Sequence, residues 1–359
     1  MCLFVLSLYE EQVSIPPFVQ YTSYREVLYL IDAAGMSPLG ANPAIQNRIT
    51  LSASRKGGIA HSLREAKWQI QLKRHDIASK IEDRLAVLLL SNDERQLCCA
   101  VKNFTGHLSP WTPVDFYVFS VNNHLERKFA QTCDRTLGAG LVFLKLQEHW
   151  ETPEAAEDPS LWTAPHFSED YRRMGHWRLA FQMEFAAKLG YKYVLQMDDD
   201  SAFPHPVTID LVKHMAAQNI SMAARNIISG DDADVTRGLA ELAKFFLVSE
   251  GMEPTTLFTE CRPADIRGLF TKGIGGPQSE GYSTRYLIGN FMIISLDFWY
   301  QEHIQRFVKL VLRTGAHFRY RWNEQQVQAL VWQMFLPPDN FHLFDFPYNH
   351  PVKPWVTCD

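Results

Sequence analysis

The sequence predicts an α/β fold with a largely parallel β-sheet flanked by helices. Short apolar runs rich in β-branched and aromatic residues alternate along the chain with longer segments of helical composition, an order typical of strand–helix–strand units. Runs at 85–90, 115–121 and 140–145 are followed by a fourth at 191–197, which ends in Asp198, Asp199 and Asp200. Crossover connections make such strands parallel, so their carboxyl ends share the edge of the sheet where ligands bind.

The other elements follow from composition and from start and stop signals. A helix is expected over 96–104, and another begins after Ser168, a natural N-cap, and ends at Gly190, a typical C-cap residue. Further helices are expected over 207–218, 239–249, 298–313 (capped by Asp297) and 322–335, and further strands over 220–225, 286–295 and 341–346. A long loop rich in glycine, proline and threonine is expected over 250–283.

Composition and charge narrow the class of protein. The chain has 359 residues, of which 46% are hydrophobic, enough for a large core. Residues 1–80 lack sustained periodicity and are expected to be an N-terminal extension, partly helical or disordered, before one main domain at 81–359. A net charge of −5 without a basic block argues against a nucleic-acid partner. No apolar run reaches the length needed to cross a bilayer.

The cysteines and glycosylation motifs carry weak signals. The 6 cysteines show no zinc-binding spacing and are too few for a disulfide framework at this length. The adjacent Cys98 and Cys99 are expected on one element, facing different ways. Asn103-Phe-Thr and Asn219-Ile-Ser match the N-glycosylation motif, which is relevant only to a secreted protein.

The three consecutive aspartates are the strongest chemical signal. Carboxylates packed so closely repel one another and need a cation, hydrogen bonds or water. Carboxylate oxygens suit a hard divalent metal such as Mn²⁺ or Mg²⁺, so a metal site is predicted here. The alternative is a solvated acidic turn.

A second polar loop follows the first strand. Ser91 and Asn92 lead into the helix at 96–104, and the free N–H groups of a helix start offer a seat for a nucleotide phosphate. Ordinary helix capping is the alternative. Arg172 and Arg178, on the helix after Ser168, are candidates to meet phosphate, and a solvated helix face is the alternative for both.

An ordered set of short blocks resembles a known family. Tyr171-Arg-Arg-Met174 precedes a helix, and the first acid of the triplet, Asp198, follows Tyr171 by 27 positions. The other blocks are Glu148-His-Trp150, Asn290-Phe291, Leu296-Asp297-Phe298, Arg321-Trp322-Asn323-Glu324 and Tyr348-Asn-His350-Pro351, with Cys358 after them. Over roughly 84–359 the chain resembles the fungal α-1,2-mannosyltransferases of glycosyltransferase family 15.

The resemblance implies a GT-A fold and a metal-dependent retaining transferase that moves mannose from GDP-mannose to a glycan or glycoprotein acceptor. It implies Mn²⁺ held by Asp198, Asp200 and His350, with both aspartates also at the donor site. Tyr171 matches a tyrosine beside the reacting centre, and Glu324 matches an acid near the acceptor. It also implies work in the Golgi lumen behind an N-terminal membrane anchor, which this chain does not show.

Some positions depart from the family pattern. Asp198-Asp199-Asp200 stands in place of Glu-Pro-Asp, Met292 in place of an active-site Glu, and Gln328 in place of a His. The shorter Asp198 reaches less far, so which acid dominates metal binding is open. Met292 motivates a second hypothesis, a catalytically impaired GT-A-like protein that binds nucleotide or glycan. A third, a metal-dependent phosphohydrolase, lacks a second acidic cluster.

Overall fold

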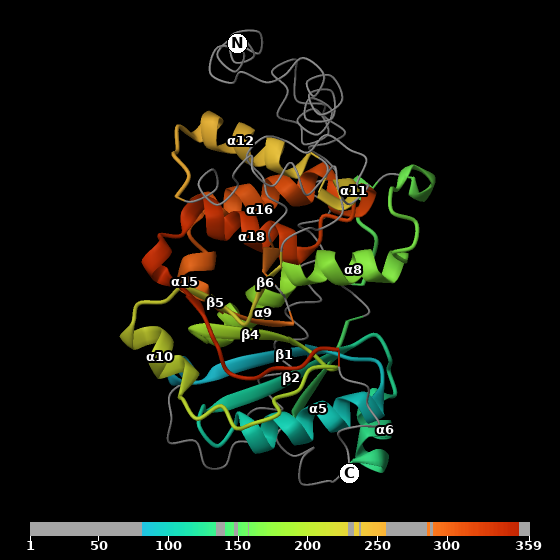
Figure 1. The fold of residues 1–359 in the computed structure, drawn as a ribbon. Helices are drawn as coiled ribbons and strands as arrows, with labels where there is room; N and C mark the ends of the chain where they lie inside the picture. Colours follow the sequence, from blue (N-terminus) through green and yellow to red (C-terminus); the bar gives the residue numbers. More distant parts are fainter. Residues whose placement is uncertain are drawn as a thin grey trace, which may run out of the picture.

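A computed structural model describes residues 81–133, 141–146, 150–156, 158–228, 233–236, 238–255, 286–287 and 290–351. The expected extension at 1–80 and most of the expected loop at 250–283 lie outside these residues, so the predictions for both remain open. Within the described residues, helices cover both faces of a central sheet (Figure 1).

The central sheet has seven strands in the described part of the chain, in the order β3-β2-β1-β4-β8-β5-β9. Their bounds are β1 Leu85–Leu90, β2 Val114–Ser120, β3 Leu141–Lys145, β4 Tyr193–Asp198, β5 Met222–Ala224, β8 Phe291–Ser295 and β9 Phe341–Leu343. Strands β3, β2, β1 and β4 are parallel, whereas β8 is antiparallel to β4 and to β5. The α/β fold with a mostly parallel sheet is therefore confirmed.

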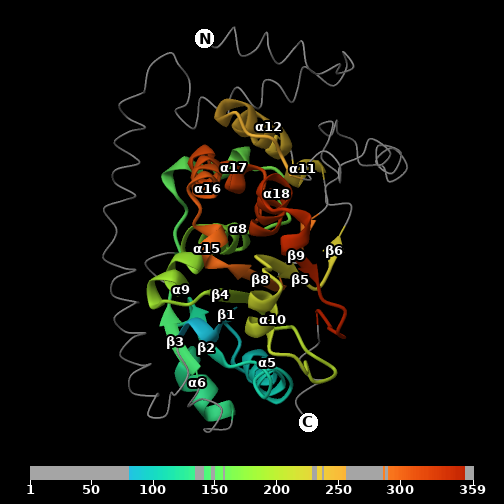
Figure 2. The same cartoon turned by 90° about the vertical axis from the view of Figure 1, so that its left-hand side faces the viewer.

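One face of the sheet is covered by α5 (Glu94–His107), α6 (Leu125–Thr132) and α10 (Leu211–Ala217). Figure 2 shows α5 and α6 on the opposite side of β1 and β2 from α8 and α16. Alternate residues of β1 divide between the two faces, because side chains along a strand point to opposite sides. Leu85, Val87 and Leu89 join the core under α5, and Ala86 and Leu88 join the core of the other face.

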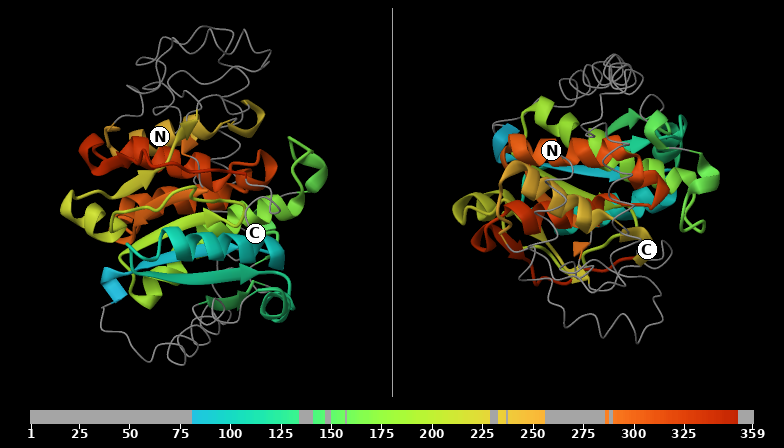
Figure 3. Two further views of the ribbon diagram at one scale, coloured as in Figure 1. Left: turned by 60° about the horizontal axis from the view of Figure 1, so that its bottom comes forward. Right: turned by 90° about the horizontal axis from the view of Figure 1, so that it is seen from above.

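The other face carries the longer helical layer, seen from two further directions in Figure 3. Its helices are α8 (Glu169–Trp177), α9 (Met183–Leu189), α12 (Leu239–Glu250), α15 (Leu296–Trp299), α16 (Glu302–Thr314), α17 (Ala316–Arg319) and α18 (Glu324–Phe335). Short elements complete the described chain: α11 (Ala233–Thr236), a ribbon of β6 (Ile227–Ile228) and β7 (Tyr286–Leu287), and the 3₁₀ turns η1 (Ile81–Asp83), η2 (Glu154–Ala156), η3 (Pro159–Leu161) and η6 (Pro338–Asn340).

The helix before β4 begins and ends where its signals predict. Ser168 accepts a hydrogen bond from the N–H of Tyr171, and Gly190 ends the helix with a left-handed φ of 95°. Between α8 and α9 the helix passes through a π-helical segment, η4 (Arg178–Gln182). The wider turn of a π segment changes which residues face inward, and both Arg178 and Gln182 are buried.

Three predicted element bounds are corrected. The helix expected from 207 begins at Leu211, because Asp210 accepts the N–H of Lys213 as an N-cap. The strand expected over 286–295 is two strands in different sheets, β7 and β8. The helix expected over 298–313 is interrupted: Asp297 lies inside α15, and α16 starts at Glu302 after Tyr300 and Gln301.

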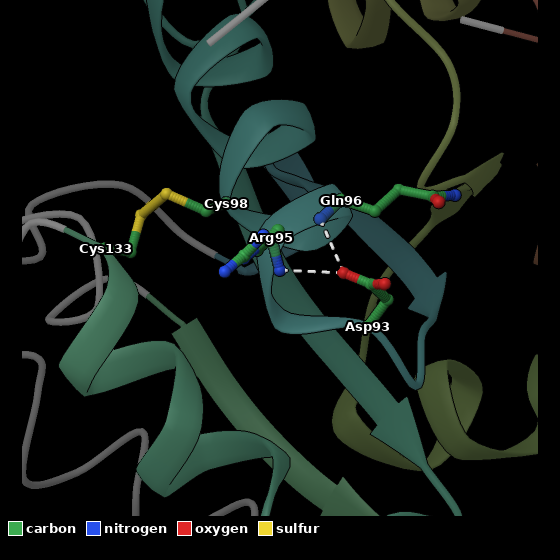
Figure 4. The surroundings of a disulfide bond; sticks show 5 residues. All are labelled: Asp93, Arg95, Gln96, Cys98 and Cys133. Carbon is green, nitrogen blue, oxygen red and sulfur yellow. Dashed lines mark hydrogen bonds between the residues drawn. A yellow bond between two sulfur atoms is a disulfide. The ribbon is translucent and has the colours of Figure 1, made fainter. Parts of the chain in front are cut away.

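A disulfide corrects the interpretation of the cysteines. Cys98 on α5 is bonded to Cys133 at the end of α6 (Figure 4). Cys98 and Cys99 both lie on α5, as expected, and both are buried. The bond spans 35 positions of sequence and ties together two helices of one face, so it restricts the unfolded chain.

Among the described residues, no helix is both long enough and apolar enough to span a membrane.

A pair of histidines joins α8 to α17 in the helical layer on the face of the sheet opposite α5. His176 Nδ1 lies 2.8 Å from His317 Nε2, and the two rings are stacked with Phe318 and Phe181 beside His176. This contact needs one ring to donate and the other to accept, so it suits the neutral form of at least one of them. Burial lowers the pKa of His176 to about 4 and that of His317 well below its usual value.

We expect this pair to make the fold acid-sensitive. The folded pKa values lie below the unfolded value near 6.5, so the unfolded chain binds more protons and stability falls as the pH drops from about 6.5 toward 4. The free energy of unfolding should fall by about 1–3 kcal/mol from this pair. Urea unfolding at several pH values measures it. His317→Asn should flatten the slope; a variant as acid-sensitive as the unaltered protein contradicts the assignment.

Candidate active site

The three aspartates lie at the carboxyl edge of the sheet, as predicted. Asp198 is the last residue of β4, and Leu90, the last residue of β1, is its neighbour in the parallel register. Ser91 at the end of β1 therefore lies beside the acidic segment. This edge brings the acids of one strand next to the loop that enters α5.

Asp198, Asp200 and His350 converge into one cluster. One ligand atom from each lies within 4.8 Å of the other two, although His350 is far away in the sequence. His350 Nε2 lies 3.0 Å from Asp200 Oδ1 and 3.5 Å from Asp198 Oδ2. The loop bearing His350 reaches the acids because Ala202 and Asn349 exchange two backbone hydrogen bonds. The structure thus assembles the three residues expected to hold the metal.

The charges in this cluster stabilise one another. Burial lowers the pKa of His350, but hydrogen bonds to Asp198 and Asp200 outweigh it and raise this pKa to about 9. Burial raises the pKa of Asp198, but Arg178 and His350 outweigh it and hold this pKa well below its usual range. His350 therefore carries a proton at neutral pH, and a metal must displace that proton to bind its ring.

Asp199, the middle acid, faces away from the cluster. Its Oδ1 accepts a hydrogen bond of 2.8 Å from Gln96 Nε2 on α5. Burial raises the pKa of Asp199 to about 6, against the lowering effect of a hydrogen bond from Ser91. The triplet is therefore divided, with Asp198 and Asp200 in the cluster and Asp199 tying β4 to the first turn of α5.

Arg178 is the functional residue that sequence reasoning misplaced. It is neither a solvated surface residue nor open to phosphate, because its side chain is 3% exposed and ion-paired with Asp198 and Glu324. Nη1 donates to Glu324 Oε1 at 2.9 Å, and Nη2 donates to Asp198 Oδ1. Gly175, Arg178 and Gln182 are all buried at helical spacings of three and four residues, so this periodicity is the signal that could have placed Arg178 on the inner face.

The two candidate catalytic residues lie here as well: Glu324 is paired with Arg178, and Tyr171 lies beside them. Glu324 is the first residue of α18 and is fully buried, with its Oε1 also 3.4 Å from Gln196 Nε2. Asn323 donates a 3.3 Å hydrogen bond to the Tyr171 hydroxyl. Burial and then the Glu324 charge raise the pKa of Tyr171. The phenol is therefore protonated at neutral pH and can donate a hydrogen bond.

Close packing of α8 on the start of α18 makes this arrangement possible. A Cβ at Gly175 would lie 2.1 Å from Asn323 Oδ1, so only glycine fits there without displacing Asn323. Arg321, just before α18, has a left-handed φ of 61°, a conformation that is uncommon outside glycine and often found at functional sites. Its guanidinium lies 4.0 Å from the centre of the Phe167 ring and 5.4 Å from that of Tyr171.

The loop after β1 fits helix capping. Asp93 Oδ1 accepts the N–H groups of Arg95 and Gln96 at the start of α5 (Figure 4). Asn92 Oδ1 accepts from Ser120 Oγ at 2.9 Å, and Ser91 Oγ lies 3.2 Å from the carbonyl oxygen of Asp93. Binding of the nucleotide-sugar donor by Ser91 and Asn92 remains a prediction, and the N–H groups of Arg95 and Gln96 are bonded to Asp93.

The prediction that Arg172 binds the donor is corrected. Its guanidinium is buried and donates to the carbonyl oxygens of Thr163, Ala164 and Phe318. These bonds fasten α8 to the segments on either side of it. Arg172 therefore has a structural role and does not reach the acidic cluster.

Two of the three departures from the family pattern, Met292 and Gln328, lie in the core beside the cluster. Met292 on β8 is fully buried and is the register partner of Gln196 on β4. Gln328 on α18 donates a 3.4 Å hydrogen bond to Gln196 Oε1. The Glu324 carboxylate, which comes from α18, contacts Gln196 in this part of the sheet.

Comparison with known proteins agrees with this geometry. The model of the family described as "Glycolipid 2-alpha-mannosyltransferase" matches residues 88–359, more than half of the chain. "Probable mannosyltransferase KTR4" of Saccharomyces cerevisiae is 30% identical over 81 residues, which span 22% of this chain and 17% of that relative.

Two solved structures share the fold. Core-mannan synthase A (CmsA/Ktr4) from Aspergillus fumigatus in its Mn/GDP form has a TM-score of 0.64 at 19% identity, covering 77% of each chain. The mannosyltransferase Ktr4p from S. cerevisiae in complex with GDP has a TM-score of 0.63 at 14% identity, covering 90% of this chain and 85% of that one. These structures show the fold, and the family match over residues 88–359 establishes that this chain belongs to the glycolipid 2-alpha-mannosyltransferase family, glycosyltransferase family 15.

Proposed function

We propose that the protein is a metal-dependent retaining mannosyltransferase that transfers mannose from GDP-mannose to a glycan or glycoprotein acceptor and forms an α-1,2 linkage. The observation that carries this proposal is the convergence of Asp198, Asp200 and His350 at the carboxyl edge of the sheet. Family membership supports the reaction type, and the Mn/GDP and GDP forms of the two similar structures support the metal and the nucleotide.

The cluster fits Mn²⁺ chemically. Two carboxylates and one imidazole form a donor set that suits Mn²⁺, and their ligand atoms are close enough to share one ion. Mg²⁺ is the second candidate because the carboxylates suit it equally. A bound divalent ion would neutralise charge on the departing diphosphate. Asp198, Asp200 and His350 would hold it, with both aspartates facing the donor.

Two residues beside the cluster, the buried Glu324 and the half-buried Tyr171, are suited to contact the substrates. Glu324 is paired with Arg178, and its Oε2 has no hydrogen-bond partner among the described residues. The Tyr171 phenol, held by Asn323, retains its proton and is suited to orient a sugar hydroxyl or the donor. In this proposal Glu324 lies near the acceptor and Tyr171 beside the reacting centre.

We place the protein in the lumen of the secretory pathway, with the Golgi as the family suggests and any membrane attachment through a segment N-terminal to the described residues. The Cys98–Cys133 disulfide supports an oxidising compartment. The net charge of −5 agrees with a sugar-nucleotide donor and a glycan acceptor as partners and with no nucleic acid.

The decisive experiment is incubation of the purified protein with GDP-mannose, Mn²⁺ and an α-mannoside acceptor. We expect GDP release and a longer mannoside that an α-1,2-specific mannosidase shortens again. Neither transfer nor donor hydrolysis with any of a panel of sugar nucleotides would reject the enzyme. GDP binding that requires Mn²⁺ but shows no turnover would instead support a binding protein, the alternative that the buried Met292 motivates.

Asp200→Ala and His350→Ala test the metal cluster. Each removes one ligand, so each should weaken Mn²⁺ binding and reduce kcat by about a hundredfold or more. Because both act through the same ion, the double variant should be little worse than either single variant. Transfer rates over a range of Mn²⁺ concentrations measure this.

Two neighbouring acids complete that experiment. Asp199→Asn is the matched control, because Asp199 bonds to Gln96 outside the cluster and should keep the Mn²⁺ dependence. Asp198→Ala decides which acid dominates the metal. A folded His350→Ala protein with normal Mn²⁺ dependence would show that the cluster does not hold the ion.

The compartment predicts which glycosylation motif is used. Asn219 is exposed in the turn after α10, whereas the Asn103 amide exchanges hydrogen bonds of 2.9 and 2.7 Å with the backbone of Phe203. We expect a glycan on Asn219 and none on Asn103 when the protein passes through a secretory pathway. Glycopeptide mass spectrometry, with Asn219→Gln as the control, measures this. An unmodified Asn219 in protein secreted by a glycosylating host contradicts it.

A further inference from the structure

We propose that Arg178 is a positioning residue for the metal, which fixes Asp198 as a one-oxygen ligand by binding its other oxygen. The inference rests on the proposed function and adds to it a residue that none of the sequence motifs includes. It comes from the contacts on the two oxygens of one carboxylate, at the junction of β4 with the π segment η4.

The two oxygens of Asp198 have different neighbours. Oδ1 accepts from Arg178 Nη2, whereas Oδ2 lies 3.5 Å from His350 Nε2 in the cluster. A carboxylate whose rotation is free can offer either oxygen or both to an ion. With Oδ1 occupied, Asp198 presents only Oδ2 toward Asp200 and His350. Partners of this kind orient metal ligands in many sites.

Arg178 itself has little freedom to move. Its side chain is 3% exposed, and its second nitrogen, Nη1, is bound to Glu324 Oε1 at 2.9 Å, with Glu324 fully buried. The planar guanidinium places two donors in a fixed fork, which a lysine ammonium cannot reproduce. A carboxylate on each side of the fork therefore sets the plane of Arg178, and Arg178 sets the orientation of Asp198.

The same contacts tie the metal ligand to Glu324. Glu324 has no other cation among its contacts in the described chain, and Gln196 is its remaining polar neighbour, at 3.4 Å. A buried carboxylate without a partner is strongly unfavourable, so replacing Arg178 alone risks unfolding the protein. A test must therefore remove the charge of Glu324 at the same time.

The experiment compares Glu324→Gln with the double variant Arg178→Met/Glu324→Gln. Both lack the buried carboxylate charge, and they differ only in the group that binds Asp198 Oδ1. Mn²⁺ affinity is measured by calorimetric titration with GDP present, and folding by circular dichroism, so no step depends on transfer activity. Arg178→Lys/Glu324→Gln is the conservative variant. Arg173→Met is the control, because Arg173 on α8 pairs with Glu169 and Asp170 near the surface.

We expect the Arg178→Met/Glu324→Gln protein to bind Mn²⁺ about 10- to 100-fold more weakly than Glu324→Gln, the usual effect of losing a partner that orients a ligand. The lysine variant should recover part of this loss, and Arg173→Met should bind like the unaltered protein. Equal Mn²⁺ affinity of Glu324→Gln and Arg178→Met/Glu324→Gln would overturn the proposal. Tighter binding would also overturn it, because it would show Arg178 acting only as a cation that repels the metal.

The unaltered protein separates this inference from the proposed function. One outcome is that the unaltered protein binds Mn²⁺ and transfers mannose while Glu324→Gln and Arg178→Met/Glu324→Gln bind Mn²⁺ equally. That result would support the proposed function and reject the role of Arg178. If the unaltered protein does not bind Mn²⁺ with GDP present, the metal-dependent function fails, and the inference that rests on it fails too.

Discussion

The carboxylate of Asp198 is held by Arg178 on one oxygen and by His350 on the other, and the rest of the site depends on these two ion pairs. Unit charges about 4 Å apart interact by about 4 kcal/mol at an effective dielectric constant of 20. Asp198, Asp200 and Glu324 would therefore repel one another strongly without cations between them. Arg178 lies between Asp198 and Glu324, and the protonated His350 ring lies between Asp198 and Asp200. This alternation of positive and negative charge stabilises the acidic edge of the sheet.

This alternation requires two helices to approach β4 closely. Arg178 comes from the π segment that links α8 to α9, and Glu324 comes from the first turn of α18. Gly175 lets α8 pack against Asn323 without a side chain between them. The packing of the helical layer on β4 therefore sets the distance between the carboxylates of Asp198 and Glu324.

Local signals predicted the parts of the site that depend on one segment. The apolar run before Asp198, the cap at Ser168 and the left-handed Gly190 each specify their own element, and the structure has all three. The contacts of Arg178 depend on carboxylates that β4 and α18 bring to it, and the sequence around Arg178 does not contain them. The Cys98–Cys133 bond depends on how α5 and α6 are placed, which the spacing of the cysteines does not contain.

His350 shows why even a correctly chosen ligand needs the whole fold. Its segment returns to the sheet edge through the backbone bonds between Ala202 and Asn349, and the Tyr348 hydroxyl lies 2.6 Å from Ser201 Oγ. Behind that contact, Tyr348 packs on Phe203 and Phe291, on the face of the sheet opposite Arg178. Apolar packing on one face thus presents the imidazole, and ion pairing on the other orients Asp198. The metal cluster forms where these two independently stabilised faces meet, at the end of β4.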